Sequence, residues 1–133
     1  MSKSKLLRIN YKEYEKPKFL RLFVVLLLRG YIYLLLRFRI TGTRDLPKGP
    51  KIFAINHPTA TDPFLIGSLF PNAKILITDE AFKFTVSNWL LKSLGHIPVN
   101  KSHGKVAYEE AKNTLLSGGD IIIFPEGRFS KDI

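Results

Sequence analysis

The pattern of apolar and polar positions divides the chain into one long apolar segment near the N-terminus and a series of shorter alternating elements behind it. As a helix, residues 19–36 would be about 27 Å long, at about 1.5 Å per residue. On a helical wheel one half of this helix is uncharged, and the other half mixes apolar residues with cations such as Arg21 and Arg29. The pattern predicts an amphipathic helix, with a bend or a division into two helices at Gly30.

Behind this segment, short apolar runs alternate with stretches of helical periodicity. The predicted strands are 51–55, 73–78, 96–99 and 120–124, and the predicted helices are 62–70, 82–94 and 105–116. This alternation predicts an α/β fold with a largely parallel or mixed sheet flanked by helices. Binding sites in such sheets lie beyond the carboxyl ends of the strands, so the loops after the predicted strands are where we look for function.

The charge distribution separates the same two regions. The chain has a formal net charge of +10. Residues 1–44 hold eleven basic and two acidic residues, whereas residues 45–133 are nearly neutral. We therefore expect a basic amphipathic leader, 1–44, and an α/β domain, 45–133. A helix of this kind is typical of the headgroup layer, with its cations reaching anionic lipid. The prediction is a membrane protein that is peripheral or monotopic, on the cytoplasmic face.

A spanning, secretory or nucleic-acid-binding role fits the leader less well. A membrane-spanning helix would place Arg29 near the middle of the bilayer, at a cost of at least about 2.5–3.5 kcal/mol. A secretory signal peptide does not fit, because the apolar run is long and no small-residue cleavage site follows it. A nucleic-acid-binding arm is rarely so rich in Leu and Val, so we expect no nucleic-acid partner. A helix packed on the domain stays open as an alternative.

Two residues around the first predicted helix of the domain are suited to acid–base chemistry. His57 follows the first predicted strand, and Asp62 begins the helix. Five positions apart, they do not share a helix face, but a loop closed by Pro58 would fold one back onto the other. A neutral imidazole can then take the proton of a hydroxyl, with a carboxylate fixing its tautomer. On spacing alone, an ordinary loop histidine and a helix start are the more common explanation of these two residues.

Two further strand ends carry groups suited to an anion. Glu126, Gly127 and Arg128 follow the last predicted strand, and the arginine offers a planar fork for a phosphate. Asn100 and Lys101 follow the third strand and would add a second contact. An ordinary turn with a surface ion pair is the alternative. The histidines show no metal-ligand spacing, the chain has no cysteine, and no glycine-rich nucleotide loop is present, so we expect neither metal nor cofactor.

Three blocks of the sequence resemble a known family. Residues 56–63, Asn-His-Pro-Thr-Ala-Thr-Asp-Pro, resemble the NHxxxxD block of the glycerolipid acyltransferases, the 1-acyl-glycerol-3-phosphate acyltransferase (PlsC-like) family. Residues 124–130, Phe-Pro-Glu-Gly-Arg-Phe-Ser, are similar to its FPEGxxS block, and residues 95–101 resemble its middle block. The resemblance implies that His57 is the general base and Asp62 its orienting partner.

The resemblance also implies substrates and partners. Glu126, Gly127 and Arg128 would bind the glycerol-phosphate part of an acceptor such as 1-acyl-glycerol-3-phosphate (lysophosphatidic acid) or a related lysolipid. The donor would be a fatty acyl thioester, acyl-CoA or acyl-ACP, used as a co-substrate, and the N-terminal helices would lie on the membrane. Lys101 stands where the family usually has arginine, which loosens phosphate binding there.

The family pattern continues beyond residue 133, so we expect a domain that is incomplete at its C-terminal end. The alternative function is therefore a truncated, catalytically inactive membrane-binding module. A lipid or thioester hydrolase, with water as the acceptor, is a weaker third possibility. The oligomeric state is not predicted.

Overall fold

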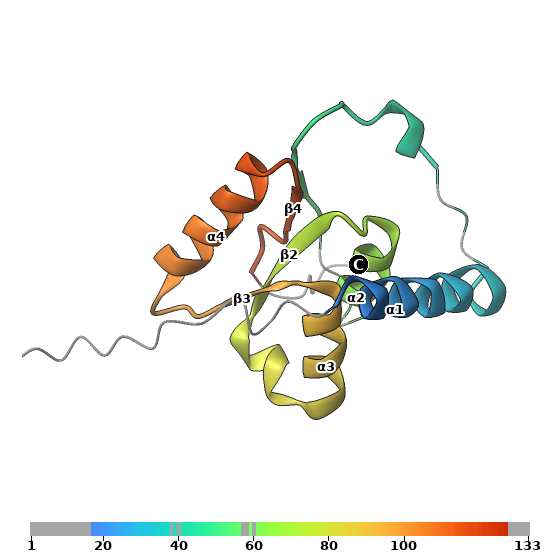
Figure 1. Ribbon diagram of the computed structural model, residues 1–133, viewed down its shortest axis with the longest axis horizontal. Coiled ribbons are helices and arrows are strands. Elements are labelled where there is room, and N and C mark those ends of the chain that lie inside the picture. The colour runs from blue at the N-terminus through green and yellow to red at the C-terminus, as the bar shows by residue number, and fades with distance from the viewer. Residues whose placement is uncertain (1–16, 38, 40, 57–58, 60, 128–133) are drawn as a thin grey trace, which may run out of the picture.

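The alternating elements expected from the sequence are present in the computed structural model, which describes residues 17–37, 39, 41–56, 59 and 61–127 (Figure 1). The helices are α1 (Lys18–Gly30), α2 (Asp62–Leu69), α3 (Thr85–Leu94) and α4 (Gly104–Leu116). The strands are β1 (Ile52–Ala54), β2 (Ala73–Thr78), β3 (Ile97–Val99) and β4 (Asp120–Ile123). Three further helical segments complete them: the wider π-helical turn η2 (Tyr31–Leu35) and the tighter 3-10 turns η3 (Thr43–Asp45) and η4 (Asp79–Lys83).

The four strands form one sheet in the order β1-β4-β2-β3, and every neighbouring pair is parallel. The last strand along the chain therefore lies inside the sheet, where Ile122 pairs with Phe53 of β1 and Ile75 of β2. Both Ile121 and Ile122 are almost completely buried. A strand covered on both faces explains why this stretch of the sequence is continuously apolar. The prediction of an α/β fold with a parallel sheet is confirmed.

Helices cover the two faces of the sheet unequally: α4 lies on one face, and α1, α2 and α3 lie on the other (Figure 1). Alternate residues of β2 divide between the two layers. Ile75 and Ile77 join the core on the α2 and α3 side with Leu91, whereas Leu76 packs toward α4 with Ala107. One helix on the α4 side leaves part of that face open, and Ile52 of the edge strand β1 is 58% exposed.

Helix α1 is packed against α2 and α3 by its charged face. Arg29 donates from Nε to the carbonyl oxygen of Ser68 at 2.9 Å and from Nη2 to that of Leu69 at 3.3 Å. Arg21 donates to the carbonyl of Pro71. These carbonyls lie at or just beyond the C-terminal end of α2, where acceptors lack helical partners and the helix dipole favours cations. The expectation that these two arginines reach anionic lipid is therefore wrong, because they bind the protein.

The opposite face of α1 and η2 is apolar and turned away from the protein. Val24, Val25 and Ile32 are buried against the domain. The side chains on the outer face are between 55% and 77% exposed: Phe19, Leu22, Phe23, Leu26, Leu27, Leu34 and Leu35. Gly30 does not divide the helix, which continues directly into η2. In the described part of the chain, no helix has the length and apolar character needed to cross a membrane.

The segment predicted as one helix from 82 to 94 is divided into η4 and α3. Phe84 is extended between them, with φ −86° and ψ 133°. The Ser87 hydroxyl lies 2.7 Å from the carbonyl oxygen of Ala81 and 3.1 Å from that of Phe84, so it competes with regular helical bonding at this point. The helix ends as predicted at Gly95, which adopts a left-handed conformation with φ 75°.

Candidate functional site at the carboxyl edge of the sheet

The sheet order determines which of the predicted loops are neighbours. Ala54 and Ile123, the last residues of β1 and β4, are paired, and the N–H of Ile55 donates to the carbonyl of Ile123 at 3.1 Å. The loops that follow β1 and β4 therefore leave the sheet side by side. Asn100, after β3, lies across β2 from β4, at two strand spacings or about 10 Å. The structure therefore brings together the loops that follow β1 and β4 and separates them from the loop that follows β3.

Asp62 is held at the start of α2 by the loop that precedes it. The backbone N–H of Thr59 donates to Oδ2 of Asp62 at 2.8 Å, and the Thr59 hydroxyl donates to Oδ1 at 2.6 Å. The hydroxyls of Thr59 and Thr61 are 2.9 Å apart. A carboxylate in the first turn also interacts favourably with the helix dipole. The loop thus folds back onto Asp62, but His57 lies outside the described residues, so its pairing with Asp62 stays a prediction.

The chain turns sharply after β4. The N–H of Gly127 donates to the carbonyl of Phe124 at 3.0 Å. Gly127 has a φ of 61°, a value that residues other than glycine rarely adopt. Glu126 and Gly127 are exposed at the carboxyl edge. Arg128 lies outside the described residues. The roles of these three residues in substrate binding stay predictions.

Asn100 shapes the loop after β3. Its amide nitrogen donates to Oδ2 of Asp79 at 2.7 Å, and its Oδ1 accepts from the backbone N–H of Ser102 at 2.9 Å. Lys101 is exposed beside it. The sequence predictions omit Asp79, although it directly follows a predicted strand and the rule applied to the other three strand ends would have found it. Among the described residues, no group of His, Asp and Glu is placed to hold a metal ion.

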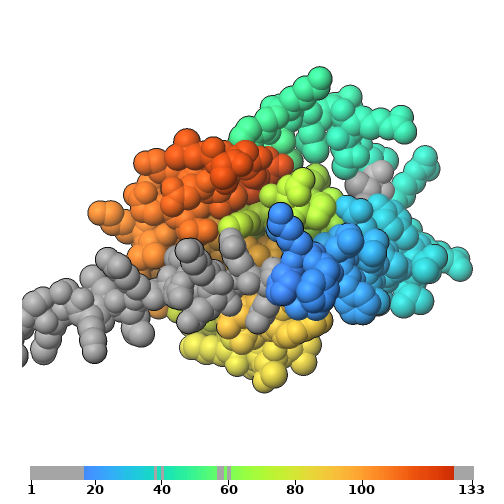
Figure 2. All heavy atoms as spheres, in the orientation of Figure 1, coloured from blue at the N-terminus to red at the C-terminus, as the bar shows by residue number. Residues whose placement is uncertain are grey.

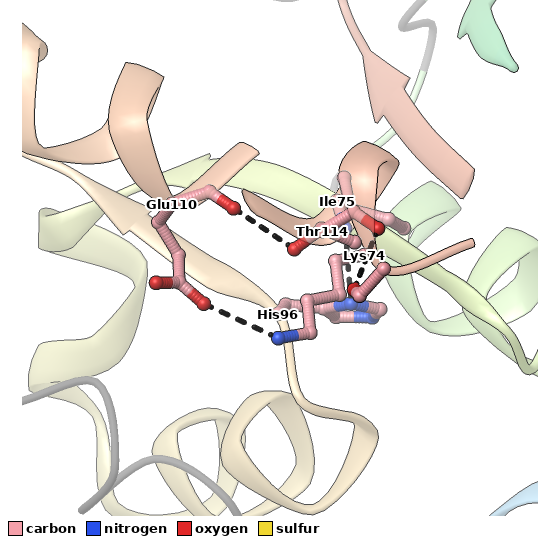
Figure 3. A network of polar contacts seen from close by, with 6 residues as sticks. Lys74, Ile75, His96, Glu110 and Thr114 are labelled. Carbon is pink, nitrogen blue, oxygen red and sulfur yellow. Dashed lines mark hydrogen bonds and ion pairs between the residues drawn. The ribbon is translucent and has the colours of Figure 1, made fainter. Parts of the chain in front are cut away.

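A buried histidine lies beneath the first helix of the domain. His96 is 1% exposed, and its Nδ1 accepts from the backbone N–H of Ile75 at 3.3 Å (Figure 3). Burial lowers the pKa of His96 to about 3, the charge of Arg21 acts in the same direction, and the carbonyl of Pro63 opposes them. A methyl group at Gly67 would lie 2.6 Å from Nε2, so α2 can approach the imidazole only because residue 67 is glycine.

This histidine therefore connects β2 to the helix that carries Asp62. In the sequence, His96 is not spaced from the other histidines as a metal ligand would be, so the sequence indicates no particular role for it. The signal that could have drawn attention to it is the glycine inside a predicted helix, because such a residue often allows a close approach. On the other face of β2, Lys74 forms an ion pair with Glu110 of α4 at 3.3 Å (Figure 3).

An apolar cavity of about 490 Å³ lies between α4 and the sheet. Its size is within the range of pockets that bind small ligands. The lining includes the last residues of β3 and β4, so the cavity reaches the carboxyl edge. The side chains that define it include Ile52, Val99, Ala107, Ala111, Leu115 and Ile123.

The fold and the site define an open α/β domain with a hydrogen-bonded carboxylate at the carboxyl edge of a parallel sheet. A family model described as Acyltransferase matches residues 37–132. The chain belongs to this acyltransferase family, and the resemblance found in its sequence blocks is confirmed. No solved structure matches the chain.

Two curated relatives act on lysolipids according to their names. The chain is 26% identical over 106 residues to the 1-acyl-sn-glycerol-3-phosphate acyltransferase LPAT1, chloroplastic, of Arabidopsis thaliana, covering 76% of this chain and 30% of that protein. It is 27% identical over 94 residues to the lyso-ornithine lipid O-acyltransferase of Pseudomonas aeruginosa, covering 69% of this chain and 36% of that protein. The chain thus spans about a third of the length of the curated relatives it matches.

Proposed function

We propose that the protein is an O-acyltransferase that moves a fatty acyl group from acyl-CoA or acyl-ACP to the hydroxyl of a lysolipid, such as 1-acyl-glycerol-3-phosphate. The observation that carries the proposal is the family match over 37–132, which includes the blocks around His57 and Glu126. The geometry agrees with it, because the loops carrying these two blocks leave the sheet side by side.

The chemistry follows from the residue types. His57 takes the proton of the acceptor hydroxyl as the oxygen attacks the thioester carbonyl carbon. The carbon–sulfur bond then breaks, and the thiol leaves with a proton. Asp62, itself oriented by Thr59, holds the imidazole in the tautomer that can accept the proton. The substrate hydroxyl is the nucleophile, so no covalent acyl-enzyme intermediate is needed.

The acceptor headgroup is bound at the turn after β4. Arg128 offers two parallel N–H donors to a phosphate, and the tight turn at Gly127 allows the headgroup to approach the backbone. Glu126 orients the arginine or accepts from a substrate hydroxyl. Lys101, on the loop shaped by Asn100, adds a positive charge from the far side of β2.

Membrane association completes the proposal. The outer face of α1 is apolar, although its charged face is occupied by the protein. Exposed leucine and phenylalanine side chains in this number are unusual on a soluble surface and are suited to the boundary between headgroups and acyl chains. We place the protein on the cytoplasmic face of a membrane, peripherally or monotopically, where a lysolipid presents its hydroxyl at the same level.

A direct assay tests the proposed transfer. Purified protein is incubated with labelled acyl-CoA or acyl-ACP and with vesicles that contain lysophosphatidic acid or lyso-ornithine lipid. We expect a labelled diacyl product that depends on the acceptor. Free labelled fatty acid in place of that product would indicate a hydrolase. A protein that binds the vesicles without forming either product would be the inactive membrane-binding module.

The cavity under α4 is the place we propose for the acyl chain of the donor. Replacing Ala111 by phenylalanine, which narrows the cavity, is expected to lower kcat/KM for palmitoyl donors about tenfold or more relative to octanoyl donors, because displacing even one methylene costs about that much. Asn113→Phe, at an exposed position of the same helix, is the matched control. Equal changes for the two donors would exclude this cavity as the acyl site.

A further inference from the structure

A second apolar surface lies at the junction of η4 and α3. We call it the α3 patch, and it consists of Phe84, Val86 and Trp89. Their side chains are 73%, 71% and 44% exposed. Single exposed apolar residues are ordinary, but three large ones within six positions at the start of one helix require an explanation. Trp89 is the sole tryptophan of the chain.

The α3 patch is presented by a firmly packed support. On the inner face of the same helix, Leu91 and Leu94 are each 1% exposed. Phe82, two residues before the patch, is buried in the main core. The hydroxyl of Ser87 bonds back to the preceding turn. The exposure of the patch is therefore a property of a fixed helix start and not of a frayed end.

The position of the α3 patch relates it to the candidate site. Because η4 begins directly after Thr78, the last residue of β2, the start of α3 lies at the carboxyl edge of the sheet. Helix α3 also packs beside α1, where Leu90 contacts the cluster of Val24 and Val25. Figure 2 shows the surfaces of α1 and α3 adjoining on one side of the molecule. The patch and the apolar face of α1 thus belong to neighbouring helices.

The chemistry of the α3 patch fits a lipid surface. Tryptophan is favoured at the headgroup level, phenylalanine is typical of the apolar face of interfacial helices, and lysine beside them can extend to anionic lipid. Lys83 is exposed immediately before Phe84. The acids of η4 are Asp79, which is bonded to Asn100, and Glu80, which is exposed. The strongly basic leader gives the chain a further attraction to anionic lipid.

We propose that the α3 patch is a second membrane-contacting element, which inserts Phe84, Val86 and Trp89 into the headgroup boundary of an anionic bilayer. This inference rests on the membrane association in the proposed function and adds a contact to it. A single amphipathic helix can roll about its own axis on a surface, whereas two neighbouring contacts define an orientation. The second contact turns the carboxyl edge of the sheet toward the layer where lysolipid hydroxyls lie.

Trp89 makes the inference directly measurable in the native protein. Vesicles of phosphatidylcholine and phosphatidylglycerol are added while tryptophan emission is recorded, with and without brominated acyl chains. We expect the emission to shift to shorter wavelength and to be quenched by the brominated lipid. If the protein sediments with the vesicles but its emission is unchanged, α1 binds alone and the inference is wrong. Emission that is already shifted without lipid, at all protein concentrations tested, would mean that polypeptide covers the patch, which also overturns it.

A pair of variants separates the α3 patch from α1. The double variant Phe84→Ser, Val86→Ser keeps Trp89 and is expected to lower the vesicle partition coefficient about tenfold or more, since each exposed apolar side chain contributes to burial in lipid. Leu116→Ser is the control, because Leu116 is 77% exposed at the end of α4, near the opposite edge of the sheet. Equal partitioning of the double variant and the control would contradict the inference. Acyl transfer is not measured, so a protein without transferase activity would leave this result intact.

Discussion

Replacement of His57 by alanine is expected to lower the rate of acyl transfer by about 10²–10⁴-fold, the range that a positioned general base contributes. The loss should appear in kcat, because the imidazole acts on the hydroxyl proton and not on the acyl chain or the headgroup. The measurement is the initial rate of diacyl product formation over a range of acceptor concentrations. Vesicle binding should be unchanged, since α1 and its apolar face are untouched. Equal rates for wild type and variant would refute the proposed mechanism.

The role of Asp62 can be separated from a role in folding. Asp62→Asn keeps the shape of the side chain but removes the charge that orients the imidazole and stabilises its protonated form. It should reduce kcat strongly and leave KM for the acceptor nearly unchanged. Asp45→Asn, at an exposed position in η3, is the matched control and should keep the wild-type rate. Wild-type kcat in the Asp62 variant would show that Thr59 and Asp62 only shape the loop.

Acidification is expected to destabilise the protein through His96. The folded protein keeps this imidazole neutral, with a pKa of about 3, whereas the unfolded chain has the ordinary value of 6.5. Below pH 6.5 the unfolded state therefore binds a proton that the folded state does not. The contribution of the neutral His96 to the free energy of unfolding is fully present above pH 6.5 and is lost progressively as the pH falls to 3. The total loss is on the order of 5 kcal/mol, at about 1.4 kcal/mol per pH unit.

Urea unfolding at a series of pH values measures this effect. Carboxylates also titrate in this range, so the comparison is with His96→Asn, whose amide oxygen can still accept from the N–H of Ile75 but does not take up a proton. The free energy of unfolding of the variant should fall less steeply between pH 6.5 and pH 4 than that of the wild type. Parallel curves would mean that His96 is solvated or protonated in the folded protein.

The fold could be predicted from the sequence to the extent that it is local. Each strand and helix of the domain has its own apolar pattern, and several end at a glycine or proline. The predicted ranges agree with the structure to within about two residues, except where η4 interrupts the helix predicted at 82–94. At that interruption Ser87 bonds to the preceding carbonyls, a contact that hydrophobic periodicity does not reveal. The order of the strands depends on contacts between distant segments, so β4 could not be placed between β1 and β2 from the sequence.

The candidate site also combines local features, which the sequence contains, with features that depend on contacts between distant segments. The residue types at three strand ends are suited to acid–base and anion chemistry, but the residues alone leave ordinary loops as the alternative. Their grouping requires the sheet order, which makes neighbours of the loops after β1 and β4 and separates Asn100 from them. A helical wheel shows that α1 is amphipathic but not which of its residues are buried. Val25 and Leu26 both lie in the half that holds the cations, yet the first is buried and the second is exposed. For that reason Arg29, expected on lipid, is found on the carbonyls of α2.

Helix α1 packs on the domain with one face and exposes the other, and this affects how the sequence of such a protein can change in evolution. The residues that attach α1 to the domain, among them Arg21, Val25 and Arg29, do not overlap with those on its outer face, such as Leu26 and Leu27. If the outer face contacts a membrane, as proposed, substitutions there would adjust affinity for membranes of different composition without moving α2 or the carboxylate at its start. Under that proposal, selection on the lipid environment and selection on catalysis would act on separate sets of positions within a single helix.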